Sequence, residues 1–261
     1  MGFKTGIIGL PNVGKSTLFN ALTKSKSAQA ANFPFCTIDP NIGEVMVPDE
    51  RLLQLSKISI SKETIPTKMT FIDIAGLVKG ASKGEGLGNK FLANIRECDA
   101  LAHVTRCFED ENVTHVNNII DPVADIDIIN TELLLADLES VTKQIENFKK
   151  RSTKKNDEML SLAFLEKVLG LLESGTPVRQ GTFSEEESRM LYLSQFLTSK
   201  PILFICNVDE NSIREGNEHS KKVEVLANNL EAPTLNISVS IEQELSEISD
   251  EKELREFLFE M

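Results

Sequence analysis

The residues from Gly9 to Ser16 have the types and the spacing needed to bind a phosphate group. They read Gly-Leu-Pro-Asn-Val-Gly-Lys-Ser and match every fixed position of the pattern G-x-x-x-x-G-K-[ST]. Gly9 and Gly14 permit a tight turn with no Cβ between the backbone and an anion. The N–H groups of the loop and the positive end of the following helix can then face the phosphates. Lys15 would reach the β- and γ-phosphates of a nucleotide, and the Ser16 hydroxyl would bind Mg²⁺.

The sequence on either side of this loop agrees with that interpretation. Gly6-Ile7-Ile8 is an apolar run typical of a buried strand, and a helical pattern begins at Thr17. A strand, a loop and a helix in this order distinguish a phosphate-binding loop from a chance glycine-rich turn. The residues expected to contact the nucleotide here are Asn12, Val13, Gly14, Lys15, Ser16 and Thr17.

Two further segments carry groups that suit a metal–triphosphate complex. Asp73 ends an apolar run and begins the sequence Asp-Ile-Ala-Gly. Its carboxylate can hold Mg²⁺, usually through a bound water, and Gly76 can offer a backbone N–H to the γ-phosphate. Thr37 lies in a proline-containing stretch and could be a second hydroxyl ligand, as in the first switch loop of GTPases, or only a turn residue. We therefore predict Ser16, Thr37 and Asp73 as metal ligands, with Lys15 and Gly76 as catalytic groups.

The residue after Gly76 is Leu77, where the best-known GTPases carry a glutamine that orients the attacking water. Leucine cannot hydrogen-bond to water, so we expect slow intrinsic hydrolysis or a water placed by another group. His115 is one candidate, because histidine can donate or accept, and the alternative is a structural histidine. Asn12 could bind K⁺ beside the phosphates and stabilise charge in the transition state, or could only stabilise the loop.

Base recognition should follow the apolar run that ends at Cys206. GTPases place N-K-x-D at this point, whereas the present chain reads Asn207-Val208-Asp209-Glu210. Asn207 is retained, but Val208 replaces the lysine and Glu210 replaces the aspartate that accepts from guanine. Because guanine selectivity depends on that carboxylate, its loss should relax or reverse the preference for GTP. Ser238 belongs to the segment expected to form the remaining base-contacting loop.

Composition places the chain among ordinary globular proteins. It has 261 residues, 41% hydrophobic and 26% charged, with a net charge of −12. No apolar run approaches the roughly 20 residues that span a bilayer, and no signal segment precedes the first strand, so we expect a cytoplasmic protein without membrane association. The negative charge argues against the bulk surface binding a polyanion, although a local basic patch still could.

Apolar runs alternate with helical patterns, which predicts an α/β domain with a mostly parallel sheet and its ligand site at the carboxyl ends of the strands. Between residues 129 and 198 this alternation is replaced by two narrow leucine-rich stripes of coiled-coil type, separated by a basic turn. We expect an inserted antiparallel helical hairpin at 129–198 and a nucleotide-binding domain made of 1–128 and 199–261. A capping-box spacing at Ser184 and Glu187 predicts a third helix. The strands are expected at 6–9, 43–47, 69–73, 100–105, 202–206 and 234–237, and the two stripes contain Leu134, Leu138, Val141, Ile145 and Phe148, then Leu162, Leu165, Leu169 and Leu172.

With these residues described, the chain resembles the YchF family of Obg-related ATPases, in the translation-factor class of GTPases. The resemblance covers essentially the whole chain and implies a GTPase-like fold with an inserted helical hairpin, and ATP preferred over GTP. It also implies association with the ribosome and a role in translation or stress control. Members usually continue into a C-terminal TGS domain, and the resemblance implies that this domain is missing after Met261. The segments that carry it are 2–4 with 9–19, 32–38, 71–88, 106–110 and 207–210.

Two other readings stay open. The chain could be an ordinary GTPase with a degenerate base motif, or a nucleotide-gated binding module in which turnover only resets the switch. The basic turn at the hairpin tip could contact ribosomal RNA or could be a solvated loop. The positive residues of this tip are Lys143, Lys149, Lys150, Arg151, Lys154 and Lys155.

Overall fold

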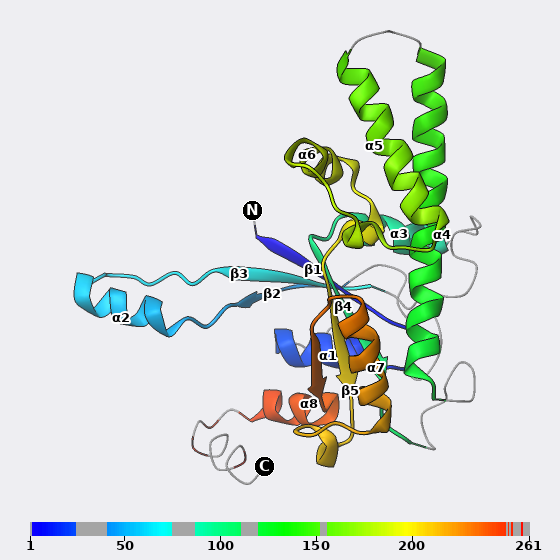
Figure 1. Cartoon of the computed structure of the whole chain (residues 1–261). Helices are drawn as coiled ribbons and strands as arrows, with labels where there is room; N and C mark the ends of the chain where they lie inside the picture. Colours follow the sequence, from blue (N-terminus) through cyan, green and yellow to red (C-terminus); the bar gives the residue numbers. More distant parts are fainter. Residues whose placement is uncertain are drawn as a thin grey trace.

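The computed structural model describes residues 2–24, 41–74, 87–110, 120–151 and 156–248, together with 250, 252 and 257. In this part of the chain six strands form one sheet in the order β2-β3-β1-β4-β5-β6 (Figure 1). All neighbouring strands are parallel except β2 and β3, so the expected α/β fold with a mostly parallel sheet is confirmed. The strands are β1 (Phe3–Ile8), β2 (Asn41–Met46), β3 (Lys68–Asp73), β4 (Ala100–Arg106), β5 (Ile202–Asn207) and β6 (Thr234–Ile237).

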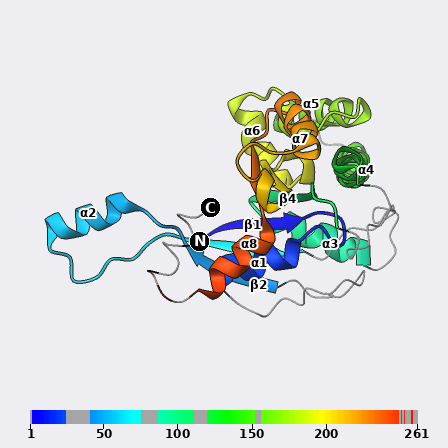
Figure 2. The ribbon, with the colours of Figure 1, turned by 90° about the horizontal axis from the view of Figure 1, so that it is seen from below.

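The central strands are covered by helices on both faces. Their apolar side chains are fully buried, as for Ile7 and Ile8 in β1 and Phe204 in β5, which explains their near-continuous hydrophobic sequence. Helices α1 (Lys15–Thr23) and α8 (Val239–Glu247) pack together on one face, whereas α4 and α7 pack together on the other (Figure 2). The remaining bounds are α3 (Leu87–Arg96), α4 (Pro122–Arg151) and α7 (Glu218–Asn229).

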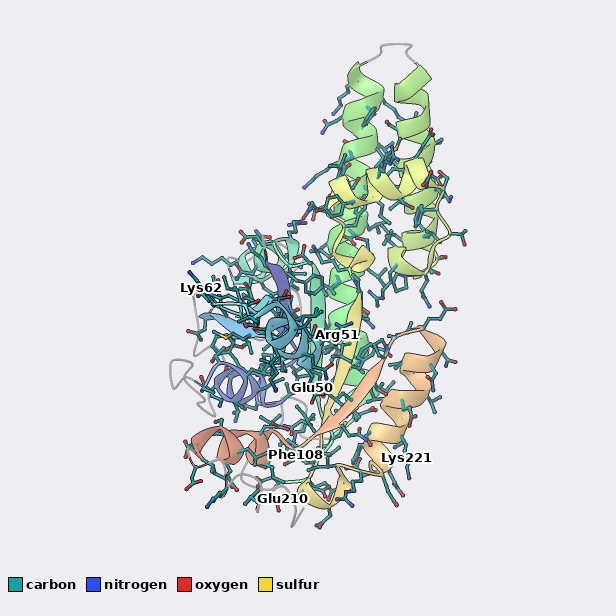
Figure 3. The ribbon with its side chains drawn as sticks, turned by 90° about the vertical axis from the view of Figure 1, so that its left-hand side faces the viewer. Glu50, Arg51, Lys62, Phe108, Glu210 and Lys221 are labelled. Atoms are coloured by element: carbon teal, nitrogen blue, oxygen red, sulfur yellow. The ribbon has the colours of Figure 1, made fainter. Side chains whose placement is uncertain are left out.

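The expected helical hairpin is present. Helix α4 runs beside α5 (Asn156–Glu173), and the pair projects from one end of the sheet (Figures 1 and 3). The lower part of α4, with Ile126 and Ile129, belongs to the core around the sheet. Its upper part, with Val141 and Ile145, belongs to a second apolar cluster shared with α5. The domain boundaries at 128/129 and 198/199 stay a prediction.

The second leucine-rich stripe predicted from the sequence includes only some of the residues that α5 buries. Phe164 and Val168 lie outside that stripe, yet they are 2% and 0% exposed, whereas Leu162 and Leu169 are only partly buried. The buried face is wider than a coiled-coil seam because α5 packs against both α4 and the short helix η2 (Val178–Gln180).

The third helix begins where the sequence predicts. Helix α6 (Glu185–Ser194) has Ser184 as its N-cap, with a complete capping box. The Ser184 hydroxyl accepts from the Glu187 N–H at 3.2 Å, and the Glu187 carboxylate accepts from the Ser184 N–H at 2.8 Å. Two orphan donors at the helix start are thereby satisfied.

A buried carboxylate ties the inserted segment back to the sheet. Asp137 of α4 accepts hydrogen bonds from the Leu197 N–H at 2.9 Å and from the Thr198 N–H at 2.7 Å. The Thr198 hydroxyl donates a third bond to it at 2.8 Å. These donors belong to η3 (Leu197–Ser199), just before β5, so Asp137 fixes the point where the chain re-enters the sheet. Burial raises the pKa of Asp137, although the three hydrogen bonds oppose that shift.

The connection between β2 and β3 forms an arm that extends away from the sheet (Figure 1). It carries α2 (Glu50–Ser59), whose N-cap Asp49 accepts from the Arg51 N–H at 3.0 Å. None of the residues of α2 is buried against the rest of the described chain. Across the described residues no helix is both long enough and apolar enough to cross a membrane.

Candidate nucleotide-binding site

The phosphate-binding loop joins β1 to α1, and two glycines set its path. Gly9 has a φ of 151°, and a Cβ built there would lie 2.4 Å from the Val104 carbonyl oxygen. Gly14 has a φ of 103°, and its Cβ would lie 2.6 Å from Nδ2 of Asn207. Both positions therefore exclude a side chain by conformation and by space. The loop can follow this path only with glycine at 9 and 14.

Lys15 is the first residue of α1 and folds back over the loop. Its side chain is 7% exposed, and Nζ donates to the Leu10 carbonyl at 2.7 Å. Burial lowers the pKa of Lys15 to about 8, against the attraction of the Asp73 carboxylate, which raises it. The ammonium group is thus poorly solvated, and a neutral backbone carbonyl accepts its hydrogen bond. Phosphate oxygens would offer it a stronger, charged partner.

Ser16 and Asp73 meet beside this lysine. Strands β1 and β3 are parallel neighbours with Ile7 opposite Asp73, so both strands end at the same edge of the sheet. The Ser16 hydroxyl donates to Oδ2 of Asp73 at 2.8 Å, and Asp73 is 2% exposed. A hydroxyl and a carboxylate in contact form the hard oxygen pair that Mg²⁺ prefers. The two described members of the predicted metal set are therefore adjacent.

Three predicted site residues cannot be placed. Thr37, Gly76 and His115 lie outside the described residues, as does Leu77. Their roles as metal ligand, phosphate contact and water-orienting group stay predictions.

Asn207 holds the phosphate-binding loop to a third segment of the chain. It ends β5, and its Nδ2 donates to the Val13 carbonyl at 3.0 Å. Its Oδ1 accepts from the Val239 N–H at 3.1 Å. Asn207 is 6% exposed, so both bonds are sheltered from water. One side chain thus fixes the loop relative to the start of α8, next to the predicted base contact Ser238.

The remaining residues of the predicted base motif differ in exposure. Val208 is 2% exposed and belongs to the apolar core around the sheet. Ser238 is also buried and shares a hydrogen bond of 2.9 Å with Ser240. Glu210 begins η4 (Glu210–Ser212) and is exposed at the same end of the sheet as Phe108 (Figure 3). A carboxylate is therefore exposed at this end of the sheet, while the side chain at position 208 is apolar and buried.

Comparison with known proteins agrees with this site. A family model described as a 50S ribosome-binding GTPase matches residues 4–155. A protein of Escherichia coli O157:H7 named ribosome-binding ATPase YchF is 49% identical over 262 residues, covering 100% of this chain and 71% of the relative. The Bacillus subtilis protein of the same name is 48% identical, covering 97% of this chain and 69% of the relative. The chain belongs to the YchF family.

A solved structure of a YchF-family member is similar over nearly the whole chain. The Schizosaccharomyces pombe protein, described as a YchF GTPase, has a TM-score of 0.82 and 37% identity, covering 99% of this chain and 71% of that one. The YchF-family membership makes the chain a P-loop nucleoside triphosphatase by fold and family. The names of its relatives differ on the nucleotide, since the bacterial proteins are named ATPases and the yeast protein a GTPase.

The site of this YchF-family chain contains a cation–aromatic pair that sequence reasoning missed. Arg106 ends β4, between the strand of the loop and the strand of Asn207. It is 2% exposed and donates to the carbonyls of Phe108 at 3.2 Å and Asp110 at 2.9 Å. Its guanidinium lies 4.8 Å from the centre of the Phe108 ring. The half-buried ring of Phe108 is thereby fixed at the edge of the sheet where the phosphate-binding loop and Asn207 lie. The sequence feature that could have revealed this pair is an arginine at the end of a mostly apolar strand.

Binding of a triphosphate should take up a proton at alkaline pH. Without ligand the pKa of Lys15 is about 8, so above that pH its amine is largely neutral. Phosphate oxygens favour the ammonium form and raise this pKa, so affinity should fall as the pH rises above about 8. Calorimetry at about pH 9 in two buffers of different ionisation enthalpy measures the protons taken up. A Lys15→Arg variant, which stays charged, should show no such uptake. Equal heats for the unmodified chain in both buffers would contradict the assignment.

Proposed function

We propose that this chain hydrolyses ATP slowly and acts as a nucleotide switch that associates with the ribosome. The observation that carries the proposal is the contact of Ser16 with Asp73 beside Lys15, at the end of a glycine-constrained loop. This arrangement combines an anion cradle, a cation and an oxygen pair for a metal, which together suit a metal-bound triphosphate. The bacterial relatives, named ribosome-binding ATPases, support ATP as nucleotide and the ribosome as partner.

We propose Mg²⁺ as the resident metal, held by Ser16 and Asp73 with Thr37 as a further ligand. When bound, Mg²⁺ neutralises charge on the β- and γ-phosphate oxygens. Lys15 would bind phosphate oxygens, and Gly76 would donate its N–H to the γ-phosphate. Asn12, with a left-handed φ of 62°, is the candidate for a K⁺ contact, for which hydrolysis in K⁺ and Na⁺ buffers should differ.

We expect ATP to bind about tenfold more tightly than GTP, equivalent to about 1.4 kcal/mol. The physical reason is that Val208 and Glu210 replace the two residues that select guanine. A Val208→Lys, Glu210→Asp double variant should shift the preference toward GTP. Titration of the four protein–nucleotide pairs with fluorescent analogues measures both ratios.

The control for this experiment is Glu231→Asp, which makes the same carboxylate shortening at an exposed position away from the phosphate-binding loop. It should leave the ATP-to-GTP ratio unchanged. The ATP preference would be wrong if the unmodified chain bound GTP equally well or better. In that case the chain would be a GTPase with an altered base motif.

A second function is favoured by Leu77. Without a side chain that orients water at this position, nucleotide binding rather than turnover would provide the output, and hydrolysis would only reset the switch. Co-sedimentation with ribosomes in the ATP, ADP and nucleotide-free states tests this. Binding that changes between ATP and ADP supports a gated module, and binding that is equal in all three states contradicts it.

We propose that the tip of the α4–α5 hairpin contacts ribosomal RNA. Lys149 and Lys150 are exposed at the end of α4. Lys150 forms a long ion pair of 3.9 Å with Glu146, and an exposed pair of this kind contributes little to stability. Lys149→Glu with Lys150→Glu should weaken ribosome binding and leave ATP affinity unchanged. The contact should also weaken steeply with salt, because each phosphate contact releases counterions.

The adjacent lysines Lys221 and Lys222 of α7 provide a matched control, since they are also exposed and consecutive. Lys221→Glu with Lys222→Glu makes the same change in net charge away from the hairpin. If both double variants weaken co-sedimentation equally, the effect belongs to net charge and the hairpin contact is wrong. If neither does, the tip is a solvated turn.

A further inference from the structure

A pocket lies at the edge of the sheet opposite to the phosphate-binding loop. Its volume of about 550 Å³ is common for pockets that bind small molecules. It is lined by Ile202, the first residue of β5, and by Pro233, which precedes β6. The phosphate-binding loop is instead bonded to Asn207, the last residue of β5. Because β5 and β6 are parallel, a ligand in this pocket would not occupy the nucleotide site.

The walls of the pocket come from segments that are far apart in the chain. One wall consists of η2, the loop after it and α6, and another consists of the turn between α7 and β6. The side chain of Gln180 joins these two walls, since its Nε2 donates to the Asn229 carbonyl at 3.3 Å. Apolar side chains line both walls, with Phe183 and Leu191 on the first and Pro233 on the second.

The ring of Phe183 is held in place from several sides. It packs edge-on against Phe164, with 6.0 Å between the ring centres, and Nζ of Lys167 lies 5.0 Å from its centre. A Cβ built on Gly181 would lie 2.7 Å from the ring, so glycine at this position leaves room for it. The aromatic wall is therefore formed before a ligand arrives, which limits the entropy that binding would cost.

Arg179 of η2 supplies the positive charge of the pocket. Its Nη1 donates to the Thr198 carbonyl at 3.3 Å. Its Nε and Nη2 are shielded from water and have no hydrogen-bond partner among the residues that the structure describes. Burial, which no acidic group in this part of the chain opposes, lowers the pKa of Arg179 to about 10. Such an arginine is unusual, because its charge loses hydration without gaining a counterion.

An anion with two acceptor oxygens would provide the partner that Arg179 needs. A carboxylate matches the planar fork of the guanidinium group and can accept two parallel hydrogen bonds from it. Since Nε and Nη2 are shielded from water, the guanidinium must turn toward the pocket as the ligand enters. Its bond to Thr198 is long and therefore opposes this turn only weakly.

The other lining residues restrict the chemistry of the ligand further. Glu231 lines the same pocket, is exposed, and would repel a second negative charge on the ligand. The fixed ring of Phe183 and the side chain of Leu191 offer apolar surface to the remainder of the molecule. The pocket therefore suits a monoanion with an apolar body.

We propose that this pocket binds a small organic monocarboxylate. The carboxylate pairs with Arg179, and the apolar body lies against Phe183 and Leu191. The site does not depend on which nucleotide the chain binds. A ligand held there contacts both the segment that follows the hairpin and the turn between α7 and β6, so it ties the inserted segment to the sheet.

The test titrates the 261-residue chain with 3-phenylpropionate and follows backbone amide signals by NMR. The signals of Gly181 and Ala232 should shift with a dissociation constant of about 1 mM or lower, as expected for so small a molecule. They should shift equally in the presence of ATP and Mg²⁺. 3-Phenylpropanamide, which has the same body and no charge, should bind at least tenfold more weakly.

Benzylmalonate tests the preference for a single negative charge, because it is 3-phenylpropionate with one more carboxylate. It should bind at least threefold more weakly than 3-phenylpropionate at neutral pH. Glu231→Gln removes the repelling charge and should reduce this difference. An unchanged difference would contradict the role of Glu231 in selecting a monoanion.

Arg179→Met keeps an apolar stem and removes the charge, so it should weaken 3-phenylpropionate binding at least tenfold. Its melting temperature should be unchanged or higher, because a shielded charge without a counterion is removed. The matched control is Arg189→Met, since Arg189 is exposed on α6 and is not one of the lining residues. This control should change binding less than twofold.

Other outcomes overturn the proposal. Equal binding of 3-phenylpropionate and its amide shows that Arg179 does not recognise the charge, and this comparison decides alone if Arg179→Met fails to fold. Equal weakening by Arg179→Met and Arg189→Met shows an effect of net charge. Signals that shift at Gly14 and Lys15 but not at Gly181 and Ala232 show that the probe binds at the phosphate-binding loop.

Discussion

Lys15→Ala should lower the affinity for ATP by roughly a hundredfold or more, equivalent to about 2.7 kcal/mol. Lys15 is the only basic side chain of the phosphate-binding motif, and its bonds to phosphate oxygens would be charge-assisted. The backbone N–H groups of the loop remain, so weak binding should persist. Calorimetric titration with ATP and excess Mg²⁺ measures the change.

The same substitution should leave the fold intact. Burial lowers the pKa of Lys15, which means that its desolvated charge destabilises the folded chain at neutral pH. Removing that charge should therefore keep the melting temperature unchanged or raise it slightly. A variant that loses both affinity and stability would show that Lys15 supports the loop itself. Undiminished ATP affinity would contradict the phosphate-binding loop.

Asn207→Ala should destabilise the chain by about 2–6 kcal/mol, because an unsatisfied buried polar group costs about 1–3 kcal/mol and two are created. These are the carbonyl of Val13 and the N–H of Val239. With the loop no longer fixed, ATP affinity should also fall at least tenfold, equivalent to about 1.4 kcal/mol. Urea unfolding and ATP titration measure the two effects separately.

A matched variant separates loop positioning from stability. Asn217→Ala removes another asparagine at the same sheet edge, which caps α7 and donates to the Cys107 carbonyl. It should lower stability with little effect on affinity. Equal loss of affinity in Asn217→Ala and Asn207→Ala would refute the positioning role.

The features that the sequence predicted well are those encoded within short segments. The phosphate-binding loop, the six strands and the capping box at Ser184 each depend on residues a few positions apart, and all appear as expected. The meeting of Ser16 with Asp73 was also predictable, because parallel strands deliver their carboxyl ends to one edge.

Most of the features that it missed depend on contacts between distant segments. Asn207 was recognised as a base-motif residue, but its bond to Val13 joins positions 194 residues apart. The wide inner face of α5 follows from packing on η2, which no periodicity in α5 reveals. The support of Phe108 by Arg106 is local, yet an arginine at a strand end is ambiguous until its burial is known.

Helix α4 has a mechanical consequence. Its 30 residues make a continuous rod about 45 Å long, anchored near its start by Ile126 and Ile129 beneath the sheet. For a rod of that length, a tilt of roughly 5° at the anchored end displaces the far end by about 4 Å. Because the start of α4 is fixed in the core around the sheet, a tilt of the helix would move the tip of the hairpin furthest. A rotation of a few degrees at the anchored end would therefore displace the tip by several ångströms.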